Sequence, residues 1–420
     1  MIGGIIMKEK FLIINAGSSS LKFSLYELPE ENEIVNGYIE KIGKQDGFLT
    51  LKYSGKKDEE EVTVKDHTEA VKLMMNRLEN YSFIKDIEEI KGIGHRVLHG
   101  GELYSDSIII DEEVLNNIKS LTKLGPLHHP GEVAGIESIQ KIFPSIPQVA
   151  VFDTAIHQTI PEENYMYATP YLWYKENGVR KYGFHGTSHK YITEKMKEKY
   201  GKTDINLIIC HLGSGASMSC IKNGICIDTT MGLTPLDGLI MGTRSGAIDP
   251  SIIEYICKEK NLSIEQATYI LNNESGLIGI AGQNDFRDLQ EKSMNGDKNS
   301  TLAISMFENS VIKYIAQYYF ELEGNVDAMI FTAGIGENAI NLRKDIIKKI
   351  SKTVNVDVDE YINGKISRYT DTKSGKISTD NSSFDILVEP TNEELMILRD
   401  TRKTINKSNK NTKKLNYTLS

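Results

Sequence analysis

The chain has 420 residues, of which 40% are hydrophobic and 25% charged, a length and composition typical of a folded protein with two domains. Its net charge of -9 argues against nucleic acid as the main partner, because phosphate recognition needs a basic surface. Four cysteines without a CxxC pair exclude a disulfide framework and a zinc ribbon, and the apolar runs are too short to span a membrane. We therefore expect a cytoplasmic protein with no membrane partner.

The first half of the chain reads as a mixed sheet with helices. Its patterns predict strands at 11–28 around a tight turn, short antiparallel strands over 32–64, helices at 68–80 and 111–123, and a buried strand at 149–152 that ends in Asp153. The pair His128-His129 lies between two prolines; a role in a site is one interpretation, and a plain loop is nearly as good a one.

The second half repeats this alternation. A helix is predicted from Thr187-Ser188 to about residue 199, strands at 205–210 and 326–332, a hairpin turn at Asn223-Gly224 and a long amphipathic helix at 300–322. Residues 354–388 read as strands. The last helix opens at Thr391, where Glu394 three residues later completes a predicted capping box.

A Gly/Ser turn between two apolar runs occurs twice, at 15–20 and at 211–217. Glycine lets the backbone come close to a ligand, and successive amide and hydroxyl groups form a cradle for anions. Two such turns in matching halves predict a duplicated nucleotide-binding α/β fold, with a phosphate chain held in a cleft between the halves.

This duplication sets the predicted domains. The first comprises 7–155 plus 388–403, because the last helix is expected to return to it, and the second comprises 156–387. Residues 401–420 carry six Lys or Arg and no acid, so 404–420 is predicted to be a basic, disordered tail.

Several polar residues stand where a phosphoryl-transfer site would need them. Arg96 and Arg244 each lie among glycines; either alone could be a surface turn residue, but together they resemble a charge clamp. His185 precedes a helix N-terminus, where an anion is favoured. Asp153 ends a buried strand, and Glu393 is left free to bind magnesium or simply favours the helix start.

Ten stretches, taken in order, resemble the acetate kinase family. They are INAGSSSLK (14–22), GHRVLHGG (94–101), VFDTA (151–155), YGFHGTSH (182–189), HLGSG (211–215), MGLTPLDG (231–238), MGTRSG (241–246), DFR (285–287), FTAGIGEN (331–338) and PTNEEL (390–395). The resemblance implies the duplicated ribonuclease-H-like fold of the sugar kinase, Hsp70 and actin superfamily. It also implies reversible, direct in-line transfer of a phosphoryl group from ATP to acetate, giving acetyl phosphate and ADP. Mg²⁺, with Mn²⁺ as a substitute, and a homodimer are implied as well.

The resemblance also assigns roles by position. Asn15 and Glu393 resemble the metal-binding pair. The catalytic residues would be Asp153, His185, Arg244 and Arg96, and the substrate residues Arg96, Leu98, Leu127 and Pro235. The ATP-binding residues would be Lys22, His211, Leu212, Gly213, Ser214, Gly215, Asp285, Phe286, Arg287, Gly334, Ile335, Gly336, Glu337 and Asn338.

One implied role needs a different chemical interpretation. A carboxylate substrate is already ionised at pH 7, so it needs no general base. We therefore expect Asp153 to position Arg96 or the metal rather than to act as an acid or base.

The chain departs from the family pattern at a few positions. Ser214 and His129 replace usual asparagines, Gly131-Glu132 replaces a more apolar pair, and Ala247 replaces a common Asp. Leu98 stands where Val is usual. The extra methylene of Leu98 should narrow the pocket for the acyl chain. We therefore expect acetate to be preferred over propionate and butyrate to be a poor substrate, since a pocket discriminates one methylene of a substrate by about 1–3 kcal/mol.

Three other interpretations stay open at this point. A propionate kinase of the same family is the first, because Thr229-Thr230-Met-Gly-Leu233 slightly resembles that subgroup. An actin- or Hsp70-like ATPase is the second, and a non-catalytic nucleotide sensor the third. Two arginines fit transfer better than slow hydrolysis, and a sensor should have lost one of the charged candidates.

Overall fold

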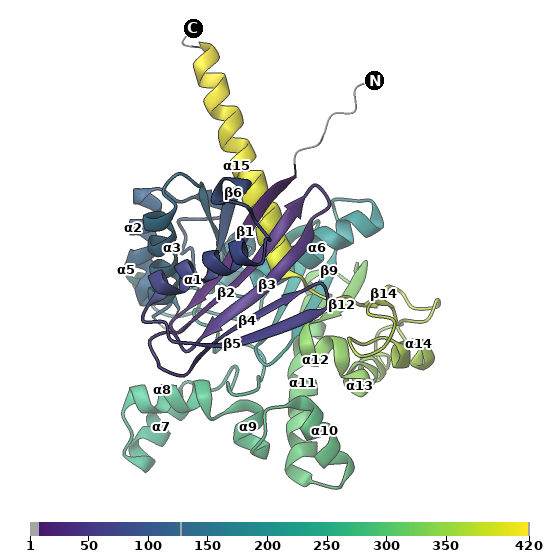
Figure 1. Cartoon of the computed structure of the whole chain (residues 1–420). Coiled ribbons are helices and arrows are strands. Elements are labelled where there is room, and N and C mark those ends of the chain that lie inside the picture. Colours follow the sequence, from purple (N-terminus) through teal and green to yellow (C-terminus); the bar gives the residue numbers. More distant parts are fainter. Residues whose placement is uncertain (1–7, 127, 419–420) are drawn as a thin grey trace. The chain divides into compact units, whose positions relative to one another are not determined.

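The computed structural model describes residues 8–126 and 128–418 (Figure 1). The chain divides into two compact units, the first formed by residues up to Ala155 and from Asn392 onward, the second by Ile156–Thr391. The predicted return at residue 388 falls instead at Asn392, because Val388 still pairs in the last long strand of the second unit.

The first unit contains an eight-stranded sheet in the order β5-β4-β3-β2-β1-β6-β8-β7. The strands β1 to β5 form an antiparallel meander, whereas β6 and β8 run parallel to β1. Their bounds are β1 Glu9–Gly17, β2 Ser20–Leu28, β3 Asn32–Glu40, β4 Gly47–Tyr53, β5 Lys56–Val62, β6 Ile90–Val97, β7 Ile108–Ile109 and β8 Gln148–Phe152.

Helices cover both faces of this sheet. Alternate residues of β1 point to opposite faces. Leu12 and Ile14 pack in a core with α1 and α3, and Phe11 and Ile13 pack against α15. The helices of this unit are α1 His67–Asn80, α2 Glu112–Ser120, α3 His129–Ile142 and α15 Glu393–Thr418.

The second unit contains a six-stranded sheet in the order β11-β10-β9-β12-β14-β13. Its strands are β9 Leu207–Leu212, β10 Ala216–Lys222, β11 Ile225–Thr229, β12 Ala328–Thr332, β13 Gly375–Lys376 and β14 Asp385–Val388. Its helices are α4 Glu162–Tyr165, α5 Tyr171–Asn177, α6 Gly186–Tyr200, α7 Ser251–Lys260, α8 Ile264–Asn273, α9 Gly276–Ala281, α10 Phe286–Met294, α11 Lys298–Glu321, α12 Ala333–Asn338, α13 Ile340–Ile350 and α14 Glu360–Lys365.

The two sheets share one topology. In each, three consecutive strands form an antiparallel meander, and two later strands add in parallel beside the first: β3-β2-β1-β6-β8 and β11-β10-β9-β12-β14. The duplication expected from the repeated turn is therefore confirmed. Both Gly/Ser turns connect the first two strands of this five-stranded repeat.

Four local predictions were wrong. Residues 354–388, expected to be strands, contain the helix α14 before β13 and β14. The loop expected around His128-His129 is the start of α3, with Pro130 in its first turn, a position that proline tolerates well. The tail expected to be disordered continues α15 to Thr418, and Ile405 near its beginning is buried against the sheet. Asn392, rather than Thr391, caps α15 by accepting a hydrogen bond from the Leu395 amide at 2.9 Å.

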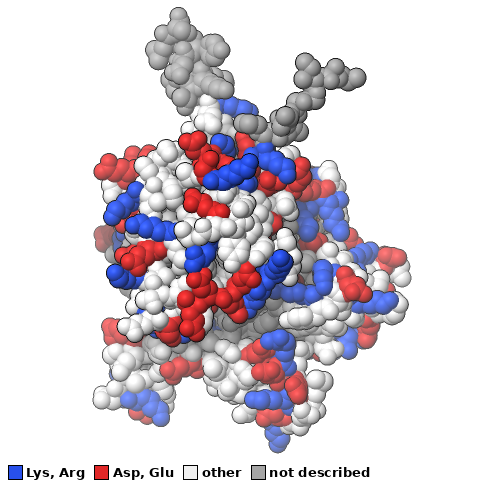
Figure 2. Space-filling view, in the orientation of Figure 1, with Lys and Arg blue, Asp and Glu red and all other residues white. Residues whose placement is uncertain are grey.

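The surface carries mixed charge. On the face drawn in Figure 2, Lys and Arg side chains are interspersed with Asp and Glu. Ion pairs are formed by some charged side chains of the protein, such as Arg77 with Glu60 at 2.7 Å. No helix among the described residues is long and apolar enough to cross a membrane.

Candidate active site

Arg96 and Asp153 form an ion pair at the carboxyl ends of two neighbouring parallel strands. Arg96 lies near the end of β6, and Asp153 directly follows β8. The Arg96 guanidinium donates to the Asp153 carboxylate at 3.1 Å, and the Asp153 amide donates to the Val97 carbonyl at 2.9 Å. With side-chain exposures of 16% and 2%, neither group is well hydrated. The pairing fits the expected role of Asp153 in positioning Arg96.

Glu393, the first residue of α15, belongs to the same unit as Arg96 and Asp153. Its pKa is raised to about 7, chiefly by burial and also by the negative charge of Asp153, while the positive charge of Arg96 opposes the shift. Repulsion between these two carboxylates would be relieved by a divalent cation, which prefers oxygen ligands. Asn15, in β1, carries an amide oxygen, which is also a suitable ligand for such a cation. The ligand atoms of Glu393 and Asn15 are thus of the type that Mg²⁺ prefers.

The first Gly/Ser turn lies against the start of α3. A Cβ atom on Gly131 would come within 2.4 Å of the Gly17 carbonyl and 2.7 Å of the Ser18 nitrogen. The ring of His67 donates from Nε2 to the Gly17 carbonyl at 2.8 Å. Backbone packing and this hydrogen bond therefore hold the turn. Lys22, on the strand after the turn, is exposed and pairs in register with Asn15.

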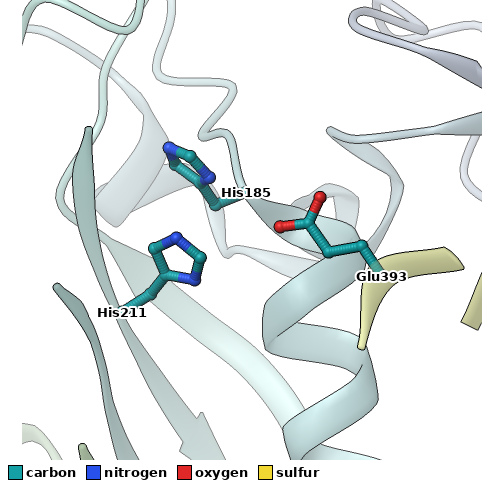
Figure 3. A group of neighbouring side chains, drawn as sticks. All are labelled: His185, His211 and Glu393. Carbon is teal, nitrogen blue, oxygen red and sulfur yellow. The ribbon is translucent and has the colours of Figure 1, made fainter. Parts of the chain in front are cut away.

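In the second unit, His185 stands before the first residue of α6. Its backbone is left-handed, with φ of 56°, a conformation that is uncommon outside glycine and frequent at functional sites. Its ring is stacked on that of His211, in β9, with the centroids 4.4 Å apart (Figure 3).

A short hydrogen-bonded chain fixes His211. The buried Ser188 hydroxyl lies 2.8 Å from His211 Nδ1 and 2.7 Å from the Thr391 hydroxyl. Because Ser188 sits in the first turn of α6, this chain connects three segments that are far apart in the sequence. It orients the ring on which His185 stacks.

Arg244 reaches the second Gly/Ser turn from a loop. An ideal Cβ on Gly215 would lie 3.2 Å from His185 Nε2 and 3.7 Å from Arg244 Nη1, so both side chains converge on this glycine. Arg244 donates to the Pro235 carbonyl at 3.3 Å, and burial lowers its pKa. The second turn thus faces an arginine and a histidine.

A pocket of about 240 Å³ opens beside the same turn. It joins parts of three segments that the resemblance assigns to ATP: 211–215, 285–287 and 334–338. Its lining residues are Ser214, Asn284, Asp285, Phe286, Arg287, Gln290, Gly334, Ile335, Asn338, Ala339, Arg368 and Tyr369.

Sequence reasoning missed five of these lining residues: Asn284, Gln290, Ala339, Arg368 and Tyr369. Arg368 enters the pocket because it pairs with Glu337 at 3.0 Å, a contact between residues 31 positions apart. No local pattern signals it. Asn284 directly precedes the quoted DFR stretch and could have been found by extending it.

The candidates for the substrate site are divided between the units. Arg96 and the buried Leu98 lie in the first unit, and Pro235 lies in the second. Leu127, also assigned to the acyl pocket, lies outside the described residues. The structure therefore groups Arg96, Leu98, Asp153 and Glu393 in one unit, and His185, His211, Arg244 and the pocket in the other.

Comparison with known proteins gives consistent matches. Residues 10–399 match the acetokinase family. The chain is 47% identical over 405 residues to an acetate kinase of Clostridium novyi, covering 95% of this chain and 99% of that protein. Among solved structures it resembles an acetate kinase of Porphyromonas gingivalis with a TM-score of 0.90 and 37% identity, covering 94% and 100% of the two chains. It also resembles a propionate kinase of Francisella tularensis with a TM-score of 0.88 and 40% identity, covering 94% and 99%. These likenesses confirm the predicted duplicated α/β fold.

Proposed function

Because this chain belongs to the acetokinase family, we infer that it is an acetate kinase, a phosphotransferase that uses a carboxyl group as acceptor. It transfers the γ-phosphoryl group of ATP to acetate and yields acetyl phosphate and ADP. The observation that carries this function is the match of residues 10–399 to one family, with acetate kinases among the most similar relatives.

We propose that the first unit binds the carboxylate. Arg96 attracts it with a guanidinium held in place by Asp153, 3.1 Å away. Leu98, two residues further on, is buried and offers an apolar side chain for the methyl group of acetate. The carboxylate is ionised at neutral pH and attacks without losing a proton, so Asp153 acts by orienting Arg96.

We propose that the second unit binds the nucleotide and stabilises the charge of the transferred group. The pocket lined by Ser214, Asp285 and Gly334 takes ATP. Arg244 and His185, which converge on Gly215, donate to the oxygens of the phosphoryl group as it moves. The stacked His211 keeps His185 in position.

Mg²⁺ is proposed as the cofactor, with Mn²⁺ as a substitute. Asn15 and Glu393 would hold it, since both offer oxygen ligands and the negative charges of Asp153 and Glu394 act on Glu393. When bound, the ion neutralises phosphate charge. A chelator should abolish turnover, and Mg²⁺ or Mn²⁺ should restore it.

The direct test is ATP turnover with acetate, propionate and butyrate, with the acyl phosphate trapped as its hydroxamate. Hydroxamate formed most efficiently from acetate supports the proposal and the narrowing effect of Leu98. A higher kcat/KM for propionate would instead favour the propionate kinase alternative. Release of ADP without hydroxamate from any acid would refute carboxylate phosphorylation.

A homodimer is proposed as the working form. The predicted candidate surface, helix 300–322, corresponds to α11, and its face containing Phe307, Val311 and Ile315 is buried. Another apolar surface is offered by α5, where Tyr171, Leu172 and Trp173 are each more than half exposed. Light scattering of the purified protein should give twice the chain mass, and charged substitutions on α5 should reduce it.

The cytoplasm is the proposed location. The four cysteines are free, and Cys210, Cys220 and Cys226 are buried. Free thiols suit a reducing compartment. Cell fractionation with an antibody to the chain tests this.

A further inference from the structure

The start of α3 is held unusually close to the first Gly/Ser turn. Gly131 allows the approach, because a Cβ there would overlap the Gly17 backbone. Gly135, one turn later, lies against the Ala16 side chain, where a Cβ would come within 2.7 Å. This close packing places Glu132, the residue after Gly131, in the interior of the first unit.

Glu132 is buried, with an exposure of only 2%. Its Oε1 accepts a hydrogen bond from the Leu98 amide at 3.0 Å. Its Oε2 has no hydrogen-bond partner among the described residues. A buried carboxyl oxygen without a hydrogen-bond partner needs an explanation, because buried polar atoms nearly always form a hydrogen bond.

The surroundings of Glu132 favour its neutral form. Its pKa is raised to about 7: burial is the main cause and the charge of Asp153 contributes, whereas Arg96 and the Leu98 amide oppose the shift. Arg96 is already paired with Asp153, so its single positive charge is shared. An incoming carboxylate would add negative charge and favour the protonated acid further. A protonated carboxyl group has one O–H to donate.

We propose that Glu132 is a substrate-binding residue whose protonated Oε2 donates a hydrogen bond to the carboxylate held by Arg96. Oε1 meanwhile fixes the Leu98 amide, so one side chain contacts both the anion and the segment that carries the acyl pocket. The proposal rests on the proposed function, since the ligand is the short-chain carboxylate of that reaction.

The proposal explains why a polar residue stands at this position. An ionised Glu132 would repel the substrate, whereas a neutral one adds a donor beside the guanidinium. Hydrogen bonds to a charged acceptor are stronger than neutral ones. A glutamine would serve the same purpose, because its amide oxygen can accept from Leu98 while its NH₂ group donates.

Steady-state kinetics of the full-length protein test the proposal, with Glu132→Gln and Glu132→Met compared with wild type. The matched control is Glu137→Gln on the same helix, where Glu137 forms a half-exposed ion pair with Lys119. Glu132→Met should raise KM for acetate by about 10-fold or more, the effect of losing about 1.4 kcal/mol, and leave KM for ATP unchanged. Glu132→Gln should keep a KM for acetate near that of the wild type.

A pH profile separates binding from a merely structural role. Wild-type kcat/KM for acetate should fall as pH rises and Glu132 loses its proton, and this fall should be absent in Glu132→Gln. Equal KM values for acetate in all variants, a parallel rise in both KM values in Glu132→Met, or the same alkaline fall in Glu132→Gln would each overturn the proposal. If Glu132→Met does not fold, the profile of Glu132→Gln decides alone. A wild-type protein that forms no hydroxamate refutes the function itself.

Discussion

The two Gly/Ser turns occupy the same place in two copies of one sheet topology, yet their surroundings differ. The first connects β1 and β2 and lies against backbone: the start of α3 packs on Gly17 and Ser18 through Gly131. The second connects β9 and β10 and faces side chains, with His185 and Arg244 near Gly215.

The difference shows that the two copies of a duplicated fold can have different roles. Where backbone packs on backbone, the shape of the turn is fixed and little charge is added. Where an arginine and a histidine converge, the turn can meet an anion whose charge changes during a reaction. We therefore expect substitutions that disturb the packing of α3 on Gly17 and Ser18 to affect stability, and substitutions of the side chains that face the second turn to affect turnover.

The largest effect is expected for Arg244→Gln. Arg244 contacts the Pro235 carbonyl and the Met241 sulfur. Because both groups are neutral, replacing Arg244 leaves no unpaired charge on either of them. An arginine that stabilises a transferring phosphoryl group contributes about 10³-fold or more to kcat. We expect kcat to fall by about that factor with little change in melting temperature.

Arg77→Gln is the matched control, because Arg77 forms a surface pair with Glu60. It should leave kcat unchanged, since such pairs contribute less than about 1 kcal/mol. If Arg244→Gln lowered the free energy of unfolding by as much as it raised the activation free energy of turnover, the two turns would not differ in the way proposed.

Much of the fold could be predicted from the sequence. The repeated turn predicted the duplication, and periodicity located strands such as β8 and helices such as α1 and α11, because these patterns are local. The start of α3 was misread, since Pro130 and two histidines resemble a loop when the packing against Gly17 is unknown. The continuation of α15 was missed because a polar composition hides the contact that buries Ile405.

The candidate site was predicted only in part. The chain order of its motifs indicated which residues to compare, and the structure brings 211–215, 285–287 and 334–338 to one pocket. Arg368 and Glu132 escaped notice as site residues, because their contacts with Glu337 and Leu98 join distant segments. The roles of all these residues stay predictions.

Gly131→Ala tests the first turn and should have the next largest effect. A methyl group there would meet the Gly17 carbonyl at 2.4 Å, and backbone cannot yield as a flexible side chain can. We expect the free energy of unfolding to fall by about 1–3 kcal/mol, although alanine is normally the better helix residue. Urea denaturation measures this.

Gly364→Ala in α14 is the control, because a Cβ there has nothing within 4 Å. It should be neutral or slightly stabilising. If Gly131→Ala were equally harmless, packing of α3 on the first turn would not be what fixes its shape.

The smallest effect is expected at the chain that orients His211 in the second unit. Ser188→Ala removes the hydroxyl that lies 2.8 Å from His211 Nδ1 and 2.7 Å from Thr391. A single hydrogen bond contributes about 0.5–1.5 kcal/mol, so kcat should fall by about 2- to 10-fold while KM for acetate stays unchanged. Thr391→Val should have a smaller effect. Adding it to Ser188→Ala should cost nothing more, because residues of one network are not additive. Fully additive losses in the double variant would show that Thr391 acts separately, and the second turn would then depend on His185 and Arg244 without this support.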